Sequence, residues 1–304
     1  MTLVLEQLLN GVQFGVTLFL LAAGLTLIFG IMGVINLAHG SLYMIGAYAT
    51  ALVIERTGSF LLAVPAGLLA AAAAGLLIEY LVIRRLYARD HIHQVLATFG
   101  LILFINEGAT MLFGRQPLFV GLPAVLSGAW EIIPGVPYPV YRIAIIAVGL
   151  LVGVDLYLLV NKTRIGMLVR AGSTRREMVR ALGVNIATLY TLVFGLGALL
   201  AGLAGLMTAP LLAVQVGMGE QILILTFVVV VIGGVGSVRG AFFGALIVGV
   251  TDTLLRAFLP GLLHRVMSVS EADALGAGLS SVGIYMVMAL VLLIKPQGLF
   301  RAQG

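Results

Sequence analysis

Residues 8–31 read LLNGVQFGVTLFLLAAGLTLIFGI, a stretch that contains no charged side chain. A helix of about 20 such residues crosses the hydrocarbon core of a bilayer. The run is longer than the apolar part of a signal peptide, and Glu6 precedes it with no Lys or Arg before the run. We therefore expect a membrane-spanning helix that stays in the mature protein.

The composition of the whole chain agrees with this first helix. Of its 304 residues, 61% are hydrophobic and 10% are charged, whereas a soluble domain carries about 25% charged residues. With a mean hydropathy of +1.17, too few polar side chains remain to cover a surface that faces water. A bilayer removes this conflict because it solvates apolar side chains. We predict an all-α polytopic membrane protein.

Seven apolar runs are long enough to span a bilayer as helices. They cover residues 8–31, 60–83, 92–113, 141–160, 186–208, 240–259 and 279–294. Two further runs, 41–54 and 221–233, are shorter, and each adjoins a glycine-rich stretch. The sequence thus predicts about nine crossings, with eight or ten as alternatives, in a single transmembrane domain of residues 1–304.

The basic residues fall in clusters between the apolar runs, as they do in cytoplasmic loops. The clusters lie at residues 84–89 and 162–180, and Lys295 and Arg301 follow the last run. This pattern leaves no basic face for nucleic acid, despite the net charge of +5. With the clusters on the inner side, the N-terminus lies outside and the C-terminus is cytoplasmic.

Glycine-rich breaks near residues 30–40 and 233–240 interrupt the apolar pattern. Interrupted helices in matching places of two halves mark the solute path of many transporters, so we expect two inverted halves, roughly 1–160 and 186–304. The candidate path residues are Asn36, His39, Gly40, Tyr43, Gly233, Gly234, Gly236 and Ser237. Structural roles stay open: His39 can bind carbonyls freed at the break, and the glycines can form a tight inner turn.

Residues 161–185 form the longest loop on the predicted inner side. Ser173 or Thr174 can cap a short helix, with Glu177 three residues after Thr174 as in a capping box, and Gly183 is a natural stop. An amphipathic helix of residues 174–182 either rests on anionic headgroups or docks a cytoplasmic subunit. No Gly-x-x-x-x-Gly-Lys-Ser/Thr motif occurs, so ATP-driven transport would need a separate ATPase chain.

Several separated motifs resemble the LivH-type permeases of ABC importers for branched-chain amino acids. They are GLTLIFGIMGVINLAHGSLYMIGAY (24–48), GMLVRA (166–171) with ALGVN (181–185), VVIGGVGSVRGAFFGALIVG (230–249) and KPQGLF (295–300). Their order along the chain makes the resemblance specific to this family, although not to one solute.

The resemblance implies a permease subunit in the bacterial inner membrane that moves branched-chain or related amino acids and needs no cofactor. The implied partners are a second, related permease, two ATPase subunits and a periplasmic substrate-binding protein. The second permease can be a homologue or another copy, and amides or urea remain open as solutes. The loop 161–185 is then the coupling region. Its candidate ATPase contacts are Arg170, Arg175, Arg176, Glu177, Arg180 and Gly183.

Two other classes of function remain as alternatives. A self-sufficient secondary transporter or channel would need ligands for a coupling ion, and the acids in the apolar runs are few: Glu79, Glu107, Asp155 and Asp252. An intramembrane enzyme would need a nucleophile and base or a metal cluster. The chain has four histidines and no cysteine, and we predict neither a catalytic nor a metal site.

Overall fold

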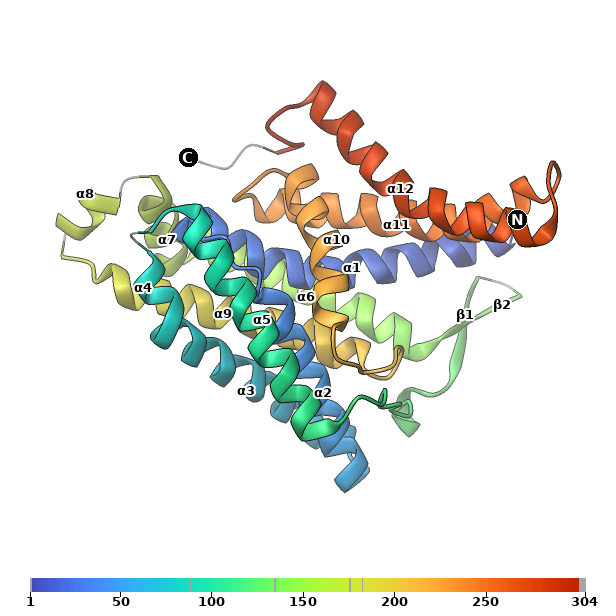
Figure 1. The fold of residues 1–304 in the computed structure, drawn as a ribbon, viewed down its shortest axis with the longest axis horizontal. Coiled ribbons are helices and arrows are strands. Elements are labelled where there is room, and N and C mark those ends of the chain that lie inside the picture. Colours follow the sequence, from blue (N-terminus) through green and yellow to red (C-terminus); the bar gives the residue numbers. More distant parts are fainter. Residues whose placement is uncertain (1, 88, 134, 175, 182, 301–304) are drawn as a thin grey trace.

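The computed structural model describes residues 2–87, 89–133, 135–174, 176–181 and 183–300. Figure 1 shows long helices packed side by side, with a small β-hairpin at one end of the bundle and α4, α7 and α8 at the other. The helices are α1 (Thr2–Met32), α2 (His39–Thr57), α3 (Phe60–Ile78), α4 (Arg84–Leu86), α5 (His91–Phe113), α6 (Val140–Lys162), α7 (Arg164–Thr174), α8 (Arg176–Ala181), α9 (Ile186–Thr208), α10 (Met218–Gly233), α11 (Val238–Leu263) and α12 (Val269–Ile294).

Seven helical spans in the described chain are long and apolar enough to cross a membrane. They include α3, which continues through a π-helical turn, η1 (Glu79–Ile83), into α4. The two short runs of the sequence became α2 and the 16-residue α10, so nine helices form the bundle of long helices. The all-α prediction is confirmed, with a 3₁₀ turn η2 (Ala124–Leu126) and the hairpin of β1 (Ala129–Ile133) and β2 (Val136–Pro139) as additions.

The start of the last helix differs from its prediction. The apolar run began at residue 279, but α12 begins at Val269. The reason is local: Ser268 and Glu271 form a capping box, in which the Glu271 carboxylate accepts hydrogen bonds from the Ser268 backbone N–H and hydroxyl. This box satisfies N–H groups that the first helical turn otherwise leaves without partners. The helix thus extends beyond its apolar stretch.

The helix contacts show that α1, α2 and α3 correspond to α9, α10 and α11. Helix α1 packs against α11, and its counterpart α9 packs against α3. Helix α2 contacts α3 and α9, and its counterpart α10 contacts α11 and α1. In Figure 1, α1 runs toward the end of the bundle that holds α7 and α8, whereas α9 starts beside α8 and runs away from it. The halves α1–α3 and α9–α11 therefore have opposite directions, as expected for an inverted repeat.

Glycines let the paired helices approach closely in both halves. A Cβ atom added to Gly249 of α11 would lie 2.4 Å from the Cα of Gly15 in α1, and one on Gly202 of α9 would lie 2.4 Å from the Cβ of Ala71 in α3. Small residues at such contacts allow backbone-to-backbone packing in membranes. The centre of the molecule is consequently built from α1, α2, α9, α10 and α11, while α5, α6 and α12 are largely exposed.

Two of the acids in the apolar runs form ion pairs. Arg256 Nε donates to Asp252 Oδ1 at 2.7 Å. Glu79 is fully buried and accepts hydrogen bonds from Arg84, from the Tyr87 hydroxyl at 2.5 Å and from the Thr191 hydroxyl at 3.0 Å. Because a buried carboxylate needs such partners, this cluster joins the C-terminal end of α3, through η1, to the start of α9.

Candidate functional site

Helix α2 begins against the middle of α1 rather than at its end. The buried His39, its first residue, donates from Nε2 to the carbonyl oxygen of Leu21 at 3.2 Å. At about 1.5 Å per residue, Leu21 lies roughly 16 Å before the end of α1 at Met32. The loop 33–38 therefore returns into the bundle before α2 starts, and Gln94 Oε1 accepts the Ile35 N–H at 3.1 Å.

Helix α10 starts beside α2. A Cβ atom on Gly40 would lie 2.2 Å from the carbonyl oxygen of Gly219, and one on Gly219 would lie 2.4 Å from the carbonyl oxygen of Gly40. Only glycine at both positions permits this approach. The first turns of α2 and α10, one from each half, thus meet deep in the protein, an arrangement typical of discontinuous transporter helices.

Polar groups without partners gather at the start of α2. Both side-chain polar atoms of Asn36, Nδ1 of His39 and Oγ of Ser41 are buried and make no hydrogen bond among the described residues. A buried polar group without a partner costs about 1–3 kcal/mol. The region therefore has spare hydrogen-bonding capacity that water or a solute can use. Tyr43, one turn further along α2, is buried against Gly205 of α9.

The predicted second break is a tight turn between α10 and α11. Gly234 and Gly236 have φ values of 100° and 83°, and Ser237 caps α11 by accepting the Gly240 N–H at 3.0 Å. Gly233 and Gly240 touch across the turn. The sequence paired this turn with the break at 30–40, but in the contact pattern the loop 33–38 corresponds to the loop 209–217, which precedes α10.

The C-terminal motif completes this turn. Leu299 N–H donates to the Ile232 carbonyl at 2.8 Å, and Phe300 N–H donates to the Gly233 carbonyl at 3.0 Å. The two carbonyls belong to the last turn of α10, which has no further helical donors of its own. Residues 295–300 thus act as a cap for α10, and the Phe300 ring stacks on Phe243 with centroids 5.3 Å apart.

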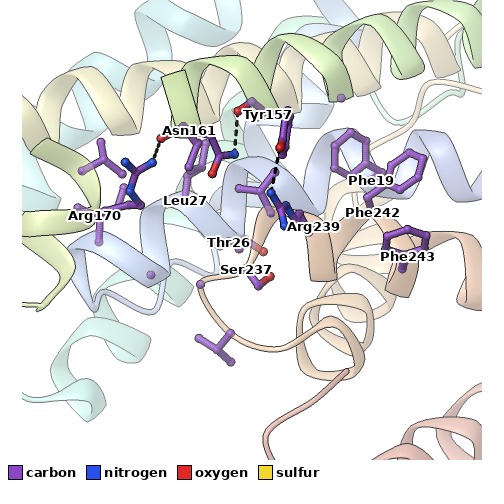
Figure 2. Close-up of a pocket in the computed structure, with 18 of the residues that line it drawn as sticks. Phe19, Thr26, Leu27, Tyr157, Asn161, Arg170, Ser237, Arg239, Phe242 and Phe243 are labelled. Atoms are coloured by element: carbon purple, nitrogen blue, oxygen red, sulfur yellow. Dashed lines mark hydrogen bonds between the residues drawn. The ribbon is translucent and has the colours of Figure 1, made fainter. Parts of the chain in front are cut away.

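A cavity of about 870 Å³ lies between α1, α6, α7 and α11. Figure 2 shows its labelled side chains, among them Thr26 and Ser237, with Arg239 reaching toward Tyr157. Arg239 donates to the Tyr157 hydroxyl at 3.1 Å, and its guanidinium lies 4.8 Å from the centre of that ring. The polar lining residues are Thr26, Tyr157, Asn161, Arg170, Ser237 and Arg239.

The predicted path residues do not form one site. Gly236 and Ser237 line the cavity, and Gly30 of α1 packs against Gly236 beside them. Asn36, His39, Gly40 and Tyr43 lie instead at the starts of α2 and α10, away from the cavity lining. Within the described residues no group of three metal-binding side chains lies close together.

The predicted coupling loop, residues 161–185, contains two helices rather than one. Helix α7 begins at Arg164, well before the predicted start at residue 174, because Thr163 accepts the Gly166 N–H and closes the first turn. Helix α8 covers most of the predicted helix, and Gly183 follows with φ 84°. Arg170 of α7 donates to the Val160 carbonyl. Arg175 and the side chains of Arg176 and Glu177 lie outside the described residues, while Arg180 is exposed.

Sequence reasoning missed two residues that organise these regions, Gln94 and Glu220. Gln94 also donates to the Leu86 and Arg89 carbonyls, at 3.3 and 3.0 Å, so it ties the loop 33–38 to the turn before α5. Asn106 of α5 donates to Glu220 in the first turn of α10 at 2.7 Å. A polar side chain within an apolar run was the available signal for Gln94, because such groups need a partner in a membrane.

Comparison with known proteins identifies the family. Residues 7–294 match the model of the branched-chain amino acid transport system / permease component family. The chain belongs to this family. It is 31% identical to the high-affinity branched-chain amino acid transport system permease protein BraD of Pseudomonas aeruginosa, over 97% of this chain and 95% of the relative.

Two further relatives are import or transport permeases with different names. The permease protein LivH of Escherichia coli is 28% identical over 97% of this chain and 94% of its own length. The ribose import permease protein RbsC of Escherichia coli is 29% identical over 76% of this chain and 71% of its own length. No solved structure matches the chain. This family member is therefore a multi-pass membrane permease, as its helices indicate.

Proposed function

We propose that this chain is the membrane-spanning subunit of an ATP-driven importer for branched-chain or related amino acids. The observation that carries the proposal is the match of residues 7–294 to a family described as the permease component of such a system. The inverted halves, with two helices that start inside the bundle, support a transport role. The similarity to RbsC means that the fold alone does not define the solute.

The solute is tested by uptake in a reconstituted complex. The permease, its ATPase subunits and the binding protein are placed in liposomes, and radiolabelled leucine, isoleucine, valine and ribose are supplied outside with ATP inside. We expect leucine-type uptake that requires both ATP and the binding protein. Uptake driven by a proton gradient in liposomes that hold this chain alone would support the secondary-transporter alternative instead.

We place the N-terminus outside and the C-terminus in the cytoplasm of a bacterial inner membrane. The support is the basic side chains at the α4, α7 and α8 end, such as Arg84, Arg164 and Arg180, because inner loops are enriched in Arg and Lys. The chain has no cysteine, so single cysteines report topology without background. We expect a cysteine at Ser127 to react with an impermeant maleimide in intact spheroplasts, and one at Lys162 to react only after lysis.

We propose that α7 and α8 dock the ATPase subunits. The exposed Arg180 and the sharp turn at Gly183 support a protruding contact surface. Substitution of Glu177 and Arg180 by alanine should leave ATP hydrolysis active but lower solute uptake at least tenfold. Arg115→Ala, in an exposed loop at the other end of the bundle, is the control. Unchanged uptake in the double variant would exclude this docking surface.

The proposed partners are two ATPase subunits, a second related permease and a periplasmic substrate-binding protein. Copurification in mild detergent from the native host tests them. Recovery of Walker A-containing chains with a second hydrophobic subunit supports the importer, whereas the chain alone after crosslinking supports the alternative.

For the solute path we propose the unpaired polar groups of Asn36 and His39 with Gly40 and Tyr43, and the inner turn Gly233–Ser237.

A further inference from the structure

The cavity between α1, α6, α7 and α11 is polar at one end and apolar at the other. Its charged residues, Arg170 and Arg239, lie near the ends of α6 and α1 beside the basic α7. Figure 2 shows three phenylalanines, Phe19, Phe242 and Phe243, gathered on the side away from Arg170. Leu150 and Val154 extend this apolar end along α6. From Asn161 to Leu150 the slot follows α6 for about 16 Å, at about 1.5 Å per residue.

The apolar part of the cavity is open at its side. Leu150 is 46% exposed, Val154 56% and Phe243 48%, although these residues lie within helices long and apolar enough to span a bilayer. At this depth an exposed side chain that does not face a water-filled cavity meets lipid chains or another protein, and all three of these side chains are apolar. A lipid tail can therefore enter the slot from the bilayer without crossing a polar barrier.

The polar end carries positive charge at the depth of the inner headgroups. Arg239 bridges from α11 to α6 through Tyr157, and its guanidinium makes no ion pair among the described residues. Arg170 is held by the Val160 carbonyl at the same end of the cavity. Guanidinium groups are strong donors to phosphate, and basic pockets between membrane helices on the cytoplasmic side bind anionic lipid headgroups.

We propose that this cavity binds one anionic phospholipid of the inner leaflet. Its phosphate contacts Arg239 and Arg170, and one acyl chain lies along Phe19, Phe242 and Phe243. The inference rests on the proposed orientation of the chain but not on its solute. An amino acid that passes the turn at Gly236 and Ser237 would leave the apolar part of the cavity unfilled, whereas a phospholipid matches both the charge at one end and the apolar surface at the other.

Two variants separate the headgroup from the tail. Arg239→Gln removes the charge, and its control is Arg265→Gln, an exposed arginine at the far end of α11. Gly153→Leu fills the slot, because a Cβ there lies 3.4 Å from the Phe19 ring, in ordinary contact. Its control is Gly278→Leu, where a Cβ meets nothing within 4 Å.

The test uses the assembled complex in nanodiscs with phosphatidylglycerol or phosphatidylcholine that carries a photoreactive acyl chain. Crosslinked peptides are mapped by mass spectrometry. We expect phosphatidylglycerol to label α6 and α11 around Val154 and Phe243 at least fivefold more than phosphatidylcholine. Arg239→Gln should lower this labelling about fivefold, the equivalent of about 1 kcal/mol per basic residue. Gly153→Leu should abolish it, and both controls should retain it.

Three results would overturn the proposal. They are equal labelling by the two lipids, labelling unchanged in Arg239→Gln and Gly153→Leu, and crosslinks that place the second permease over Val154 and Phe243 in the complex. The lipid preference is measured on the unaltered protein, so the test holds even where a variant is poorly made. Leucine uptake is scored separately after the same complex is reconstituted into liposomes, so loss of the lipid site is distinguishable from failure of the importer assignment.

Discussion

The loops that precede α2 and α10 occupy matching places in the two halves, but they are held in different ways. The loop 33–38 is mostly buried and is tied by side chains, with Gln94 on Ile35 and His39 on Leu21. The loop 209–217 is tied by backbone, through two hydrogen bonds between Leu118 and Val214 at 2.8 and 2.9 Å. The two halves thus share their helix packing, but different hydrogen bonds hold the loops 33–38 and 209–217.

The difference separates a rigid break from an adaptable one. Backbone pairing at Val214 depends on no particular side chain, and Asn106 adds a bond to Glu220 nearby. The first loop and the first turn of α2 instead place the side chains of Asn36 and Ser41 in the interior without a hydrogen-bond partner among the described residues. Groups with unused hydrogen-bonding capacity can exchange water or solute. We expect the loop 33–38 to respond to transport and the loop 209–217 to serve as its fixed counterpart.

The largest effect on folding is expected where the first turns of α2 and α10 touch. Gly40→Leu would bring a side chain against the Gly219 carbonyl, where even a Cβ lies 2.2 Å from the oxygen. Because backbone atoms cannot yield at this contact, the variant should lose nearly all folded, monodisperse protein in size-exclusion chromatography. Gly100→Leu, with open space around it, should behave as wild type. A normal yield of Gly40→Leu would show that α2 and α10 need not cross so closely.

The next largest effect concerns the side-chain support of the first loop. Gln94→Leu removes the acceptor of the Ile35 N–H and the side-chain donor to the Leu86 and Arg89 carbonyls, although the Leu86 carbonyl keeps the Arg89 N–H. The cost is about 1–3 kcal/mol for each group that stays buried without a partner. We expect the thermal midpoint in detergent to fall by roughly 5–10 °C. Gln215→Leu, in the second loop, should change it by less than about 2 °C, since no side-chain hydrogen bond of Gln215 occurs among the described residues. Equal effects would remove the distinction between the loops.

A smaller effect is expected at the support of the second loop. Asn106→Leu removes the bond to Glu220, which is partly exposed, so we expect a loss of about 1 kcal/mol and a midpoint lower by roughly 2–4 °C. Glu220→Gln keeps an acceptor for Asn106 and should lose less. If Asn106→Leu destabilises more than Gln94→Leu, the second break is the one that depends on side chains.

The smallest effect on stability is expected at Asn36. Its side chain makes no hydrogen bond in the described structure, so Asn36→Leu should leave the thermal midpoint within about 2 °C, because no bond is lost. Uptake in the reconstituted importer should nevertheless fall about tenfold, since the amide then cannot serve solute or water. Uptake and stability that are both unchanged would assign Asn36 no part in transport.

Much of the fold follows from the sequence because hydropathy acts locally. The apolar runs predicted the spanning helices. The early start of α12 was missed because a capping box extends the helix into polar sequence. The pairing of the breaks was wrong because Gly-rich composition identifies a break but not the helix it packs against.

The cavity could not be predicted for a different reason. Phe19 and Phe242 lie in apolar runs, where a ring that faces a slot and one that faces lipid look the same. Tyr157 and Arg239 are far apart in the chain, and no pattern of sequence joins a tyrosine in α6 to an arginine in α11. The glycines at 40 and 219 were visible, but their contact depends on the tilt of two helices from separate halves.

The cap formed by residues 295–300 has a consequence for the order in which the protein is made. Among the described residues, the carbonyls of Ile232 and Gly233 accept the N–H groups of Leu299 and Phe300, so the last turn of α10 is not capped when α10 first enters the membrane. The cap forms only after α11 and α12 are inserted and Phe300 has left the ribosome. A chain halted between residues 294 and 299 therefore holds its described spanning helices but lacks this cap.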